Sequence, residues 1–396
     1  MKREAFDESQ LKHLRQTREG HLAYFPPHVP RSVPVSSELL FDLSAADRAL
    51  GELSGVGKRL RNPQMLIRPY LHREAVLSSR IEGTQSSLSD LLLFEADAEL
   101  PDADDAREVV NYVRALESGI RRLPSLPISH RLVLSLHRLL LQGVRGENKR
   151  PGEFRTSQNW IGARGTPIED ADFVPPPPEA LADALDDWER YIHEADNVPP
   201  LLRCALVHYQ FETIHPFIDG NGRIGRLLMP LFLIERGCLS QPLLYLSAYF
   251  ESNRSDYYTA LSLGRLKGDL DPWLRLFLKA VETQSRDASA RADEITKLEA
   301  SYRERIKRSR SRVTHGMIDD LFMSMFVTAA RVATRQKVTA VSARAAISEL
   351  VGVDILREIT GKNYGRVYVP PELLAILDRP AFRPAPTRSP RSQGPS

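Results

Sequence analysis

The chain has 396 residues, which exceeds a single average core and predicts two or three domains. Lys and Arg number 54 against 51 Asp and Glu, and a net charge of only +3 argues against a surface that binds nucleic acid as a whole. The longest apolar runs, around residues 227–234, are too short to span a membrane, and the charged N-terminus is not followed by the apolar block of a secretory signal. Cys204 and Cys238 lie in apolar helical stretches without metal-ligand spacing and are interpreted as core thiols. We therefore expect a cytoplasmic protein without a membrane partner.

The N-terminal third is predicted to be an extended arm followed by helices. Several prolines in residues 25–34 favour extended backbone. Helical patterning follows over residues 37–61, 70–82, 104–122 and 130–141. The second of these helices ends in SSRIEG, residues 78–83.

A β-hairpin is predicted after these helices. Residues 154–161, FRTSQNWI, and residues 172–175, DFVP, are short extended segments that flank a polar loop. Four prolines at 175–178 end the hairpin, and a helix is predicted over residues 179–194. The pattern alone also fits a plain surface hairpin.

The most informative segment is residues 215–226, HPFIDGNGRIGR. Residues 201–214 before it have apolar side chains at spacings of three and four, which predicts a buried helix. Pro216 cannot continue that helix, so the chain should turn at His215. A second apolar helix is predicted to open at Gly222, where free backbone amides and the helix dipole favour a bound anion.

Each side chain of this turn suits one part of phosphate chemistry. His215 has an ordinary pKa near neutrality and is the candidate general base. Asp219 is a hard oxygen ligand for a Mg²⁺ that bridges phosphates. Arg223 and Arg226, three apart on one helix, suit successive phosphates of a di- or triphosphate.

The small residues of the turn complete the candidate site. Gly220 and Gly222 let the backbone approach phosphate oxygens, and Asn221 can donate an amide hydrogen bond. Taken singly, a histidine at a helix end is usually capped or solvated, and paired arginines usually lie on a surface. Their combination on one turn favours catalysis.

The C-terminal part is predicted to be a charged linker and a small domain. Residues 282–312 are rich in charge and predict a solvated helix. Helices over residues 315–326, 328–336 and 340–350, then a strand pair around residues 361–365, follow winged-helix order. Ser342 and Ser348 on the third helix are poor base readers, which favours packing or dimerisation over DNA binding. The basic side chains available to face phosphates are Arg331, Arg335, Lys337, Arg344, Lys362 and Arg366.

HPFIDGNGRIGR is similar to the signature of the Fic family: His, any residue, Phe, any residue, Asp or Glu, Gly, Asn, Gly, Arg, two variable residues, Arg. Every fixed position is met. The resemblance implies a mainly α fold, a helical bundle with a small β-hairpin flap, followed by a winged-helix domain. It implies transfer of AMP from Mg-ATP to a Tyr, Ser or Thr hydroxyl, with His215 as base and Asp219 on the metal. The nucleotide contacts that it implies are Phe217, Gly220, Asn221, Gly222, Arg223 and Arg226, together with Asn253, Tyr257 and Tyr258, where aromatics at helical spacing fit a core equally well.

SSRIEG resembles the inhibitory motif of the same family, which implies roles for Ser78, Glu82 and Gly83. By this resemblance Glu82 would pair with Arg226 and block the γ-phosphate position. An ordinary exposed helix glutamate is the alternative. The family resemblance also makes the hairpin around Trp160 the flap on which a target peptide docks as an added strand.

The resulting domain plan has five parts. Residues 1–103 form the N-terminal arm and helices with the inhibitory helix, and residues 104–281 form the Fic catalytic domain. Residues 282–312 are the linker helix, 313–377 the winged helix and 378–396 a disordered tail.

Several functional alternatives remain open at this stage. The same pocket suits another donor or removal of AMP, with Glu82 positioning a water. A DNA-binding regulator with a nucleotide-sensing Fic-like domain is a second class. Self-modification and a homodimer also remain open.

Overall fold

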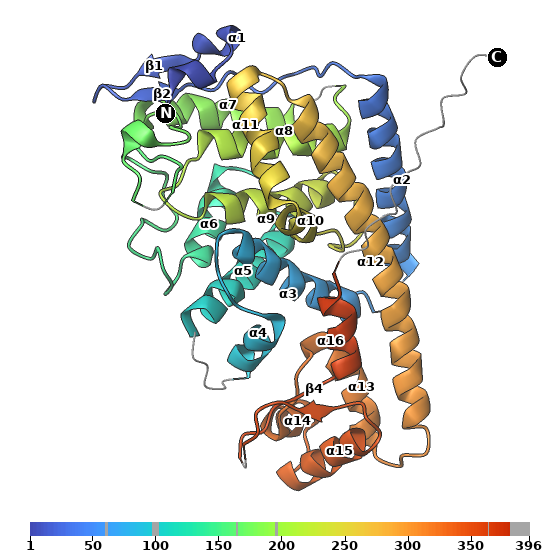
Figure 1. Cartoon of the computed structure of the whole chain (residues 1–396). Coiled ribbons are helices and arrows are strands. Elements are labelled where there is room, and N and C mark those ends of the chain that lie inside the picture. The colour runs from blue at the N-terminus through green and yellow to red at the C-terminus, as the bar shows by residue number, and fades with distance from the viewer. Residues whose placement is uncertain (60–61, 97–102, 164, 195–196, 363, 381–396) are drawn as a thin grey trace, which may run out of the picture.

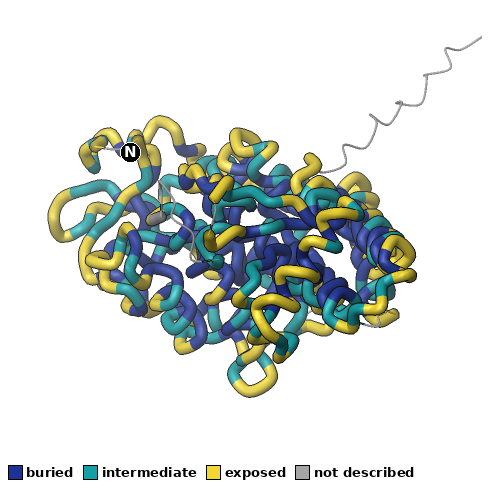
Figure 2. The backbone as a smooth tube through the Cα atoms, turned by 90° about the horizontal axis from the view of Figure 1, so that it is seen from below, coloured by how far each residue is buried: buried dark blue, intermediate teal, exposed yellow. Residues whose placement is uncertain are grey.

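The computed structural model describes residues 1–59, 62–96, 103–163, 165–194, 197–362 and 364–380, and this part of the chain is predominantly helical (Figure 1). Two consecutive helices, α8 (Pro200–Ile214) and α9 (Asn221–Glu235), form its centre. Every residue of 201–214 is buried, including the polar Arg203 and Glu212, so other parts of the chain cover α8 on all sides. The tube drawing shows the same buried interior beneath an exposed rim (Figure 2).

The helices around this centre largely follow the predicted positions. They are α2 (Ser37–Arg59), α3 (Gln64–Ile81), α5 (Ala103–Arg122), α6 (His130–Leu140) and α7 (Leu181–His193), the last preceded by η3 (Pro178–Ala180). The helix α3 begins at Gln64, earlier than predicted, and contains Pro69. The end predicted for α2, residues 60–61, lies outside the described residues. The sequence prediction missed α4 (Leu88–Glu95), which a capping box between Ser87 and Asp90 begins.

The long helix α12 (Asp271–Arg305) runs along α2 and corrects one prediction (Figure 1). Residues 282–312 are not a solvated linker, because Ala288, Ala292, Ile295, Leu298 and Tyr302 are buried. Their spacing of three and four forms an apolar stripe that the surrounding charges concealed. The predicted boundary at 281/282 therefore falls inside one continuous helix. The shorter helices α10 (Ser247–Ser252) and α11 (Arg254–Lys267) precede it.

The C-terminal elements are α13 (Arg312–Ser324), α14 (Ala329–Gln336), α15 (Ala340–Gly352), β3 (Arg357–Glu358), β4 (Tyr368–Val369) and α16 (Pro371–Asp378). Ser311, Thr328 and Thr339 cap α13, α14 and α15 by accepting a backbone hydrogen bond. Three helices followed by an antiparallel strand pair is the predicted order, and the winged-helix class stays a prediction. The helices α13 and α16 contact α3, and α16 also contacts α12.

The end of the chain differs from its prediction. Asp378 belongs to α16, and Arg379 forms an ion pair with Glu294 at 2.9 Å, so residues 378–380 are not a free tail. The rest of the predicted tail, residues 381–396, lies outside the described residues.

Strands are few and short. In the N-terminal arm, after η1 (Arg3–Ala5) and α1 (Glu8–Leu11), the strands β1 (Leu14–Gln16) and β2 (Leu22–Tyr24) pair antiparallel. Among the described residues, the predicted flap hairpin is reduced to one antiparallel bridge between Ile161 and Phe173, which lie on either side of η2 (Ile168–Asp170). The prolines that begin at Pro175 lack the N–H that a ladder needs, which limits pairing.

Two further sequence expectations have structural outcomes. Cys204 is buried as predicted, whereas Cys238 is only half-buried, because it lies in the turn after α9 has ended. Within the described part of the chain, no helix combines the length and the apolar character that crossing a bilayer requires.

Candidate active site

The signature begins where α8 ends, and the backbone turns sharply there. His215 has left-handed dihedrals, φ 50° and ψ 60°, which are uncommon for a residue other than glycine. Its carbonyl accepts a hydrogen bond from Arg155 Nε at 3.0 Å and another from Asn159 Nδ2 at 3.4 Å. Asn159 Nδ2 also donates to the Phe217 carbonyl at 2.7 Å. The flap segment therefore holds the turn in this conformation.

The His215 imidazole is neutral at physiological pH. Burial lowers its pKa from 6.5 to about 4, and the nearby Arg155 cation acts in the same direction. Among the described residues, its Nδ1 is buried without a hydrogen-bond partner. A neutral imidazole has a free lone pair, so His215 is in the protonation state that a general base requires.

Asn221 and Phe217 build the loop itself. Asn221 Oδ1 accepts from the Phe217 N–H and Asn221 Nδ2 donates to the Phe217 carbonyl, both at 2.8 Å. Phe217 is fully buried and stacks on His137 with ring centroids 3.7 Å apart. Asn221, the predicted amide donor, and Phe217, the predicted nucleotide contact, are therefore both engaged in contacts that hold the loop in its conformation.

The N-terminus of α9 faces the loop, as the sequence predicts, and the helix begins at Asn221, one residue before Gly222. The first intrahelical bond runs from the Ile224 N–H to the Gly220 carbonyl, so the N–H groups of the first turn lie outside the ladder. A Cβ at Gly222 would lie 2.3 Å from Glu82 Oε1. The Glu82 carboxylate therefore lies where the helix start would attract a phosphate.

Asp219 lies at the entrance of this loop. Its Oδ1 accepts from the Gly220 N–H at 2.6 Å and is 3.4 Å from Arg223 Nη2. The side chain is 38 % exposed, so solvent reaches it. No cluster of three or more His, Cys, Asp or Glu side chains among the described residues forms a metal cage. A cation at Asp219 would take its other ligands from phosphates and water, as Mg²⁺ prefers.

Both arginines of the signature are buried and paired with carboxylates. Arg226 Nη2 is 2.7 Å from Glu82 Oε1, and the same guanidinium donates to Ser78 Oγ at 3.0 Å and to the Ser78 carbonyl at 2.9 Å. Burial raises the pKa of Glu82, but the charge and the hydrogen bond of Arg226, together with the nearby Arg223 and His215, outweigh burial, and the net shift is downward. Arg223 Nη1 is 3.2 Å from Glu108 Oε2. In this state each guanidinium is paired with a carboxylate.

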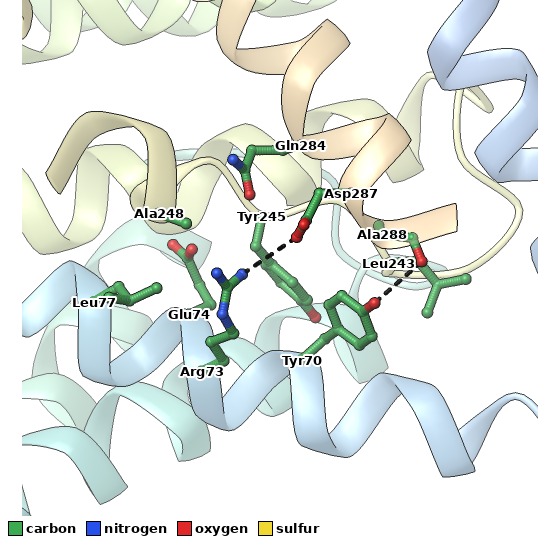
Figure 3. Close-up of a pocket in the computed structure, with 10 residues that line it drawn as sticks. All are labelled: Tyr70, Arg73, Glu74, Leu77, Leu243, Tyr245, Ala248, Gln284, Asp287 and Ala288. Atoms are coloured by element: carbon green, nitrogen blue, oxygen red, sulfur yellow. Dashed lines mark hydrogen bonds and ion pairs between the residues drawn. The ribbon is translucent and has the colours of Figure 1, made fainter. Parts of the chain in front are cut away.

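The helix α3 carries Ser78 and has Glu82 at its C-cap, and the middle of this helix is held by contacts with neighbouring elements (Figure 3). In a small pocket between α3, α10 and α12, Arg73 lies 3.9 Å from Asp287. The Tyr70 hydroxyl donates to the Ala288 carbonyl at 3.1 Å. Glu74 accepts from the Ser247 N–H at 3.1 Å and from the Ser247 hydroxyl at 2.6 Å. Burial raises the pKa of Glu74 to about 7, against the effect of these bonds. The contacts hold α3 in the position that pairs Glu82 with Arg226.

Two domain families match this chain. The Fic/DOC family N-terminal domain matches residues 40–121, and the Fic/DOC family domain matches residues 127–233, which include the whole signature. The chain contains a Fic domain. The N-terminal match includes α3 and α5, so the helix that carries Ser78 lies in the part that precedes the Fic domain.

Similar proteins support this assignment. Protein adenylyltransferase Fic from Drosophila grimshawi is 34 % identical over 159 residues, which is 40 % of this chain and 29 % of that protein. The chain thus spans less than a third of that curated relative. A Fic family protein from Desulfovibrio desulfuricans G20 has a TM-score of 0.56 at 18 % identity over 85 % of this chain and 97 % of that chain. Fic-1 from C. elegans has a TM-score of 0.50 at 25 % identity over 62 % of this chain and 72 % of that chain. The fold is therefore the helical Fic fold.

The residues predicted to contact the nucleoside separate in the structure. Tyr257 is buried, stacks with Phe250 and shares a 2.8 Å hydrogen bond with His208, so it belongs to the main hydrophobic core. Asn253 Nδ2 donates to the Tyr249 carbonyl at 2.8 Å before α11. Tyr258 remains accessible at 41 % exposed. Helical spacing could not distinguish the core tyrosine from its exposed neighbour.

Trp160 lies on the flap as predicted and is 43 % exposed. Its Nε1 donates to the Thr166 carbonyl at 2.8 Å, which fixes the ring on the loop. Residue 164 of this loop lies outside the described residues.

Sequence reasoning missed four residues that shape the Fic domain site. His137, Arg155 and Asn159 donate hydrogen bonds to backbone carbonyls of the signature loop, and Glu108 pairs with Arg223. His137 Nδ1 accepts from the Gly152 N–H at 2.9 Å, so Nε2 carries the proton and donates to the Asp219 carbonyl at 3.0 Å. These contacts join segments far apart in the chain, and no local spacing indicates them.

Proposed function

We propose that this protein is an auto-inhibited protein adenylyltransferase that transfers AMP from Mg-ATP to a Tyr, Ser or Thr hydroxyl of a target protein. The observation that carries the proposal is the convergence of His215, Asp219 and the α9 N-terminus around one turn, with Arg223 and Arg226 on the same helix. A base, an oxygen ligand for a cation and a positively polarised helix start are the groups that transfer of a nucleotide requires.

The reaction follows from the positions of these groups. The neutral His215 imidazole takes the proton of the target hydroxyl, whose oxygen forms a bond to the α-phosphorus of ATP. The bond from that phosphorus to the bridging oxygen breaks, and pyrophosphate leaves with the electron pair. Mg²⁺ held by Asp219 would neutralise charge on the phosphates. The guanidiniums of Arg223 and Arg226 would hold the leaving β- and γ-phosphates.

Inhibition follows from the position of Glu82. Its carboxylate pairs with Arg226 and lies over Gly222, where we expect a phosphate of ATP to bind. The carboxylate and the phosphate are both negatively charged, so they compete for the same place. ATP must displace this carboxylate or bind with its terminal phosphate misplaced. We infer that the parent protein transfers AMP slowly until α3 or Glu82 moves.

The names of the relatives support the reaction class, and the exposed flap supports a protein target. We infer that a target segment docks beside Trp160, by backbone pairing with the strand-like flap.

For the C-terminal domain we favour packing over DNA binding. Arg335 forms an ion pair with Asp320 at 2.6 Å, and Arg331 lies over the Phe326 ring, so two of the six candidate phosphate contacts are used internally.

The direct test uses ATP labelled at either end of its phosphate chain. With Mg²⁺ and a lysate or the protein itself as acceptor, label in the α-phosphate should become protein-bound and label in the γ-phosphate should not. Mass spectrometry should find one added adenylyl group on a hydroxyl side chain. Protein-bound γ-label would indicate a kinase. Loss of AMP from a previously modified protein without forward transfer would reverse the proposed direction.

The pH dependence of transfer provides a separate prediction. With Glu82→Gly, kcat/KM should stay level from neutral pH to about pH 5 and decline below it, because His215 is protonated only there. Its pKa of about 4 lies below the ordinary 6.5, and loss of the Glu82 charge, which raises this pKa, moves the decline further toward acid. A rate profile over pH, with circular dichroism to confirm folding at each point, measures this. A decline centred at 6.5 would show that His215 is solvated in the working enzyme.

A further inference from the structure

A buried carboxylate behind the signature holds two arginines together. Glu108 of α5 is 2 % exposed. Its Oε2 is 3.2 Å from Arg223 Nη1, and its Oε1 is 3.5 Å from Arg145 Nε. Thr84, just after the inhibitory motif, donates its hydroxyl to Oε2 at 3.1 Å. One fixed acid therefore places a signature arginine and an arginine from outside the signature side by side.

Arg145 lies at the solvent-exposed edge of this cluster. Its side chain is 65 % exposed, in contrast to Arg223, whose side chain is 3 % exposed. The next residue, Gly146, has a φ of +96°, and a Cβ there would lie 2.8 Å from Asp219 Oδ2. The loop thus packs against the proposed metal ligand, and this close contact places the Arg145 backbone beside Asp219.

The charges of this cluster indicate an anionic ligand. Three guanidiniums, those of Arg145, Arg223 and Arg226, face the carboxylates of Glu82, Glu108 and Asp219, so the cluster is formally neutral. Displacement of Glu82 leaves one positive charge, and a divalent cation would raise it to three. A triphosphate then matches the site, and Arg145 is the most exposed of the three cations.

The Glu108 carboxylate is held in place more firmly than the Glu82 carboxylate. The Glu82 side chain is 33 % exposed and pairs with one arginine, whereas Glu108 is enclosed and contacts two arginines and Thr84. Arg223 Nε is buried without a hydrogen-bond partner among the described residues. The guanidinium can therefore keep Glu108 on one side and still receive a ligand oxygen on another.

We propose that Arg145 is a further phosphate-binding residue, which contacts the terminal phosphates of the triphosphate and the departing pyrophosphate. Glu108 is a positioning residue, which holds the Arg145 and Arg223 guanidiniums toward the same ligand. The proposal rests on the proposed function, because it assumes a nucleoside triphosphate in this site. It assigns a recognition role to a loop outside the signature.

The test measures equilibrium binding, so it does not depend on transfer activity. In full-length protein carrying Glu82→Gly, calorimetry with Mg²⁺ gives the Kd for ATP, AMP and pyrophosphate. Arg145→Ala should weaken ATP and pyrophosphate about ten- to a hundred-fold, the range expected for one charge-assisted contact, and leave AMP unchanged. Arg145→Lys should recover part of the loss, because it restores charge without the fork. Arg131→Ala, at an exposed position of α6, serves as the matched control.

The outcomes separate this proposal from its alternatives. Unchanged ATP affinity in Arg145→Ala, or an equal loss for ATP and AMP, would overturn it. Glu108→Gln should weaken ATP binding in the same direction as Arg145→Ala, whereas tighter binding would show that Glu108 is a second inhibitory carboxylate. Melting temperatures identify any variant that has lost its fold, and the exposed Arg145 position keeps the test usable if Glu108→Gln unfolds. If ATP binding responds as expected but AMP is never transferred, the proposed function fails and the binding site stands.

Discussion

His215→Ala should abolish AMP transfer when it is introduced into the active Glu82→Gly protein. Loss of a general base typically lowers a rate by about a hundred- to ten-thousand-fold. The loss should be nearly complete here, because the other ionisable groups of the signature are Asp219, which pairs with Arg223, and arginines, which stay protonated and cannot act as a base. The rate of α-labelled AMP incorporation under single-turnover conditions measures the effect. ATP affinity should change little, since the imidazole acts on the target hydroxyl rather than on the phosphates.

The control for this substitution is His28→Ala. The His28 side chain is 81 % exposed and lies in the N-terminal arm, so its loss removes a histidine without touching the signature. It should label like the Glu82→Gly parent. If His215→Ala also labels like that parent, the base has been assigned to the wrong residue.

Glu82→Gly should raise the AMP-transfer rate of the otherwise unaltered protein. A charge-assisted hydrogen bond contributes about 1.5–3 kcal/mol. Removing the 2.7 Å pair with Arg226 should therefore raise the rate of AMP transfer by about ten- to a hundred-fold. Arg226 would keep its two bonds to Ser78, so the cation is not left alone in the interior. Initial rates of labelling at fixed Mg-ATP, compared with the parent, measure the release.

A conservative change at the same position sharpens this test. Glu82→Gln keeps the size of the side chain and removes its charge, so its rate should fall between those of the parent and Glu82→Gly. The melting temperature of both variants should decrease modestly without ATP and recover when Mg-ATP is added, because the ligand binds only the folded state. A Glu82→Gly protein as slow as the parent would show that α3 has another role.

Local patterns predicted much of the fold because they depend on neighbouring residues. The apolar spacing of α8, the turn forced at His215 by Pro216 and the amides at the start of α9 involve residues within a few positions of each other. Patterns failed where burial depends on a partner. The charged surface of α12 concealed a stripe that α2 and other helices cover, and among the described residues the predicted flap strands pair through one bridge, between Ile161 and Phe173.

The sequence by itself determined the chemical groups of the candidate site, because HPFIDGNGRIGR places a base, an acid and two cations on one turn. It also indicated the contact between Glu82 and Arg226 through resemblance. Only the tertiary structure decided which groups are available. Phe217, Asn221 and Tyr257 are enclosed, whereas Glu108 and Arg145 join the site from separate segments. The physical reason is that ion pairs and burial depend on distance in space, and residues such as Glu108 and Arg223 meet only after the helices that carry them have packed.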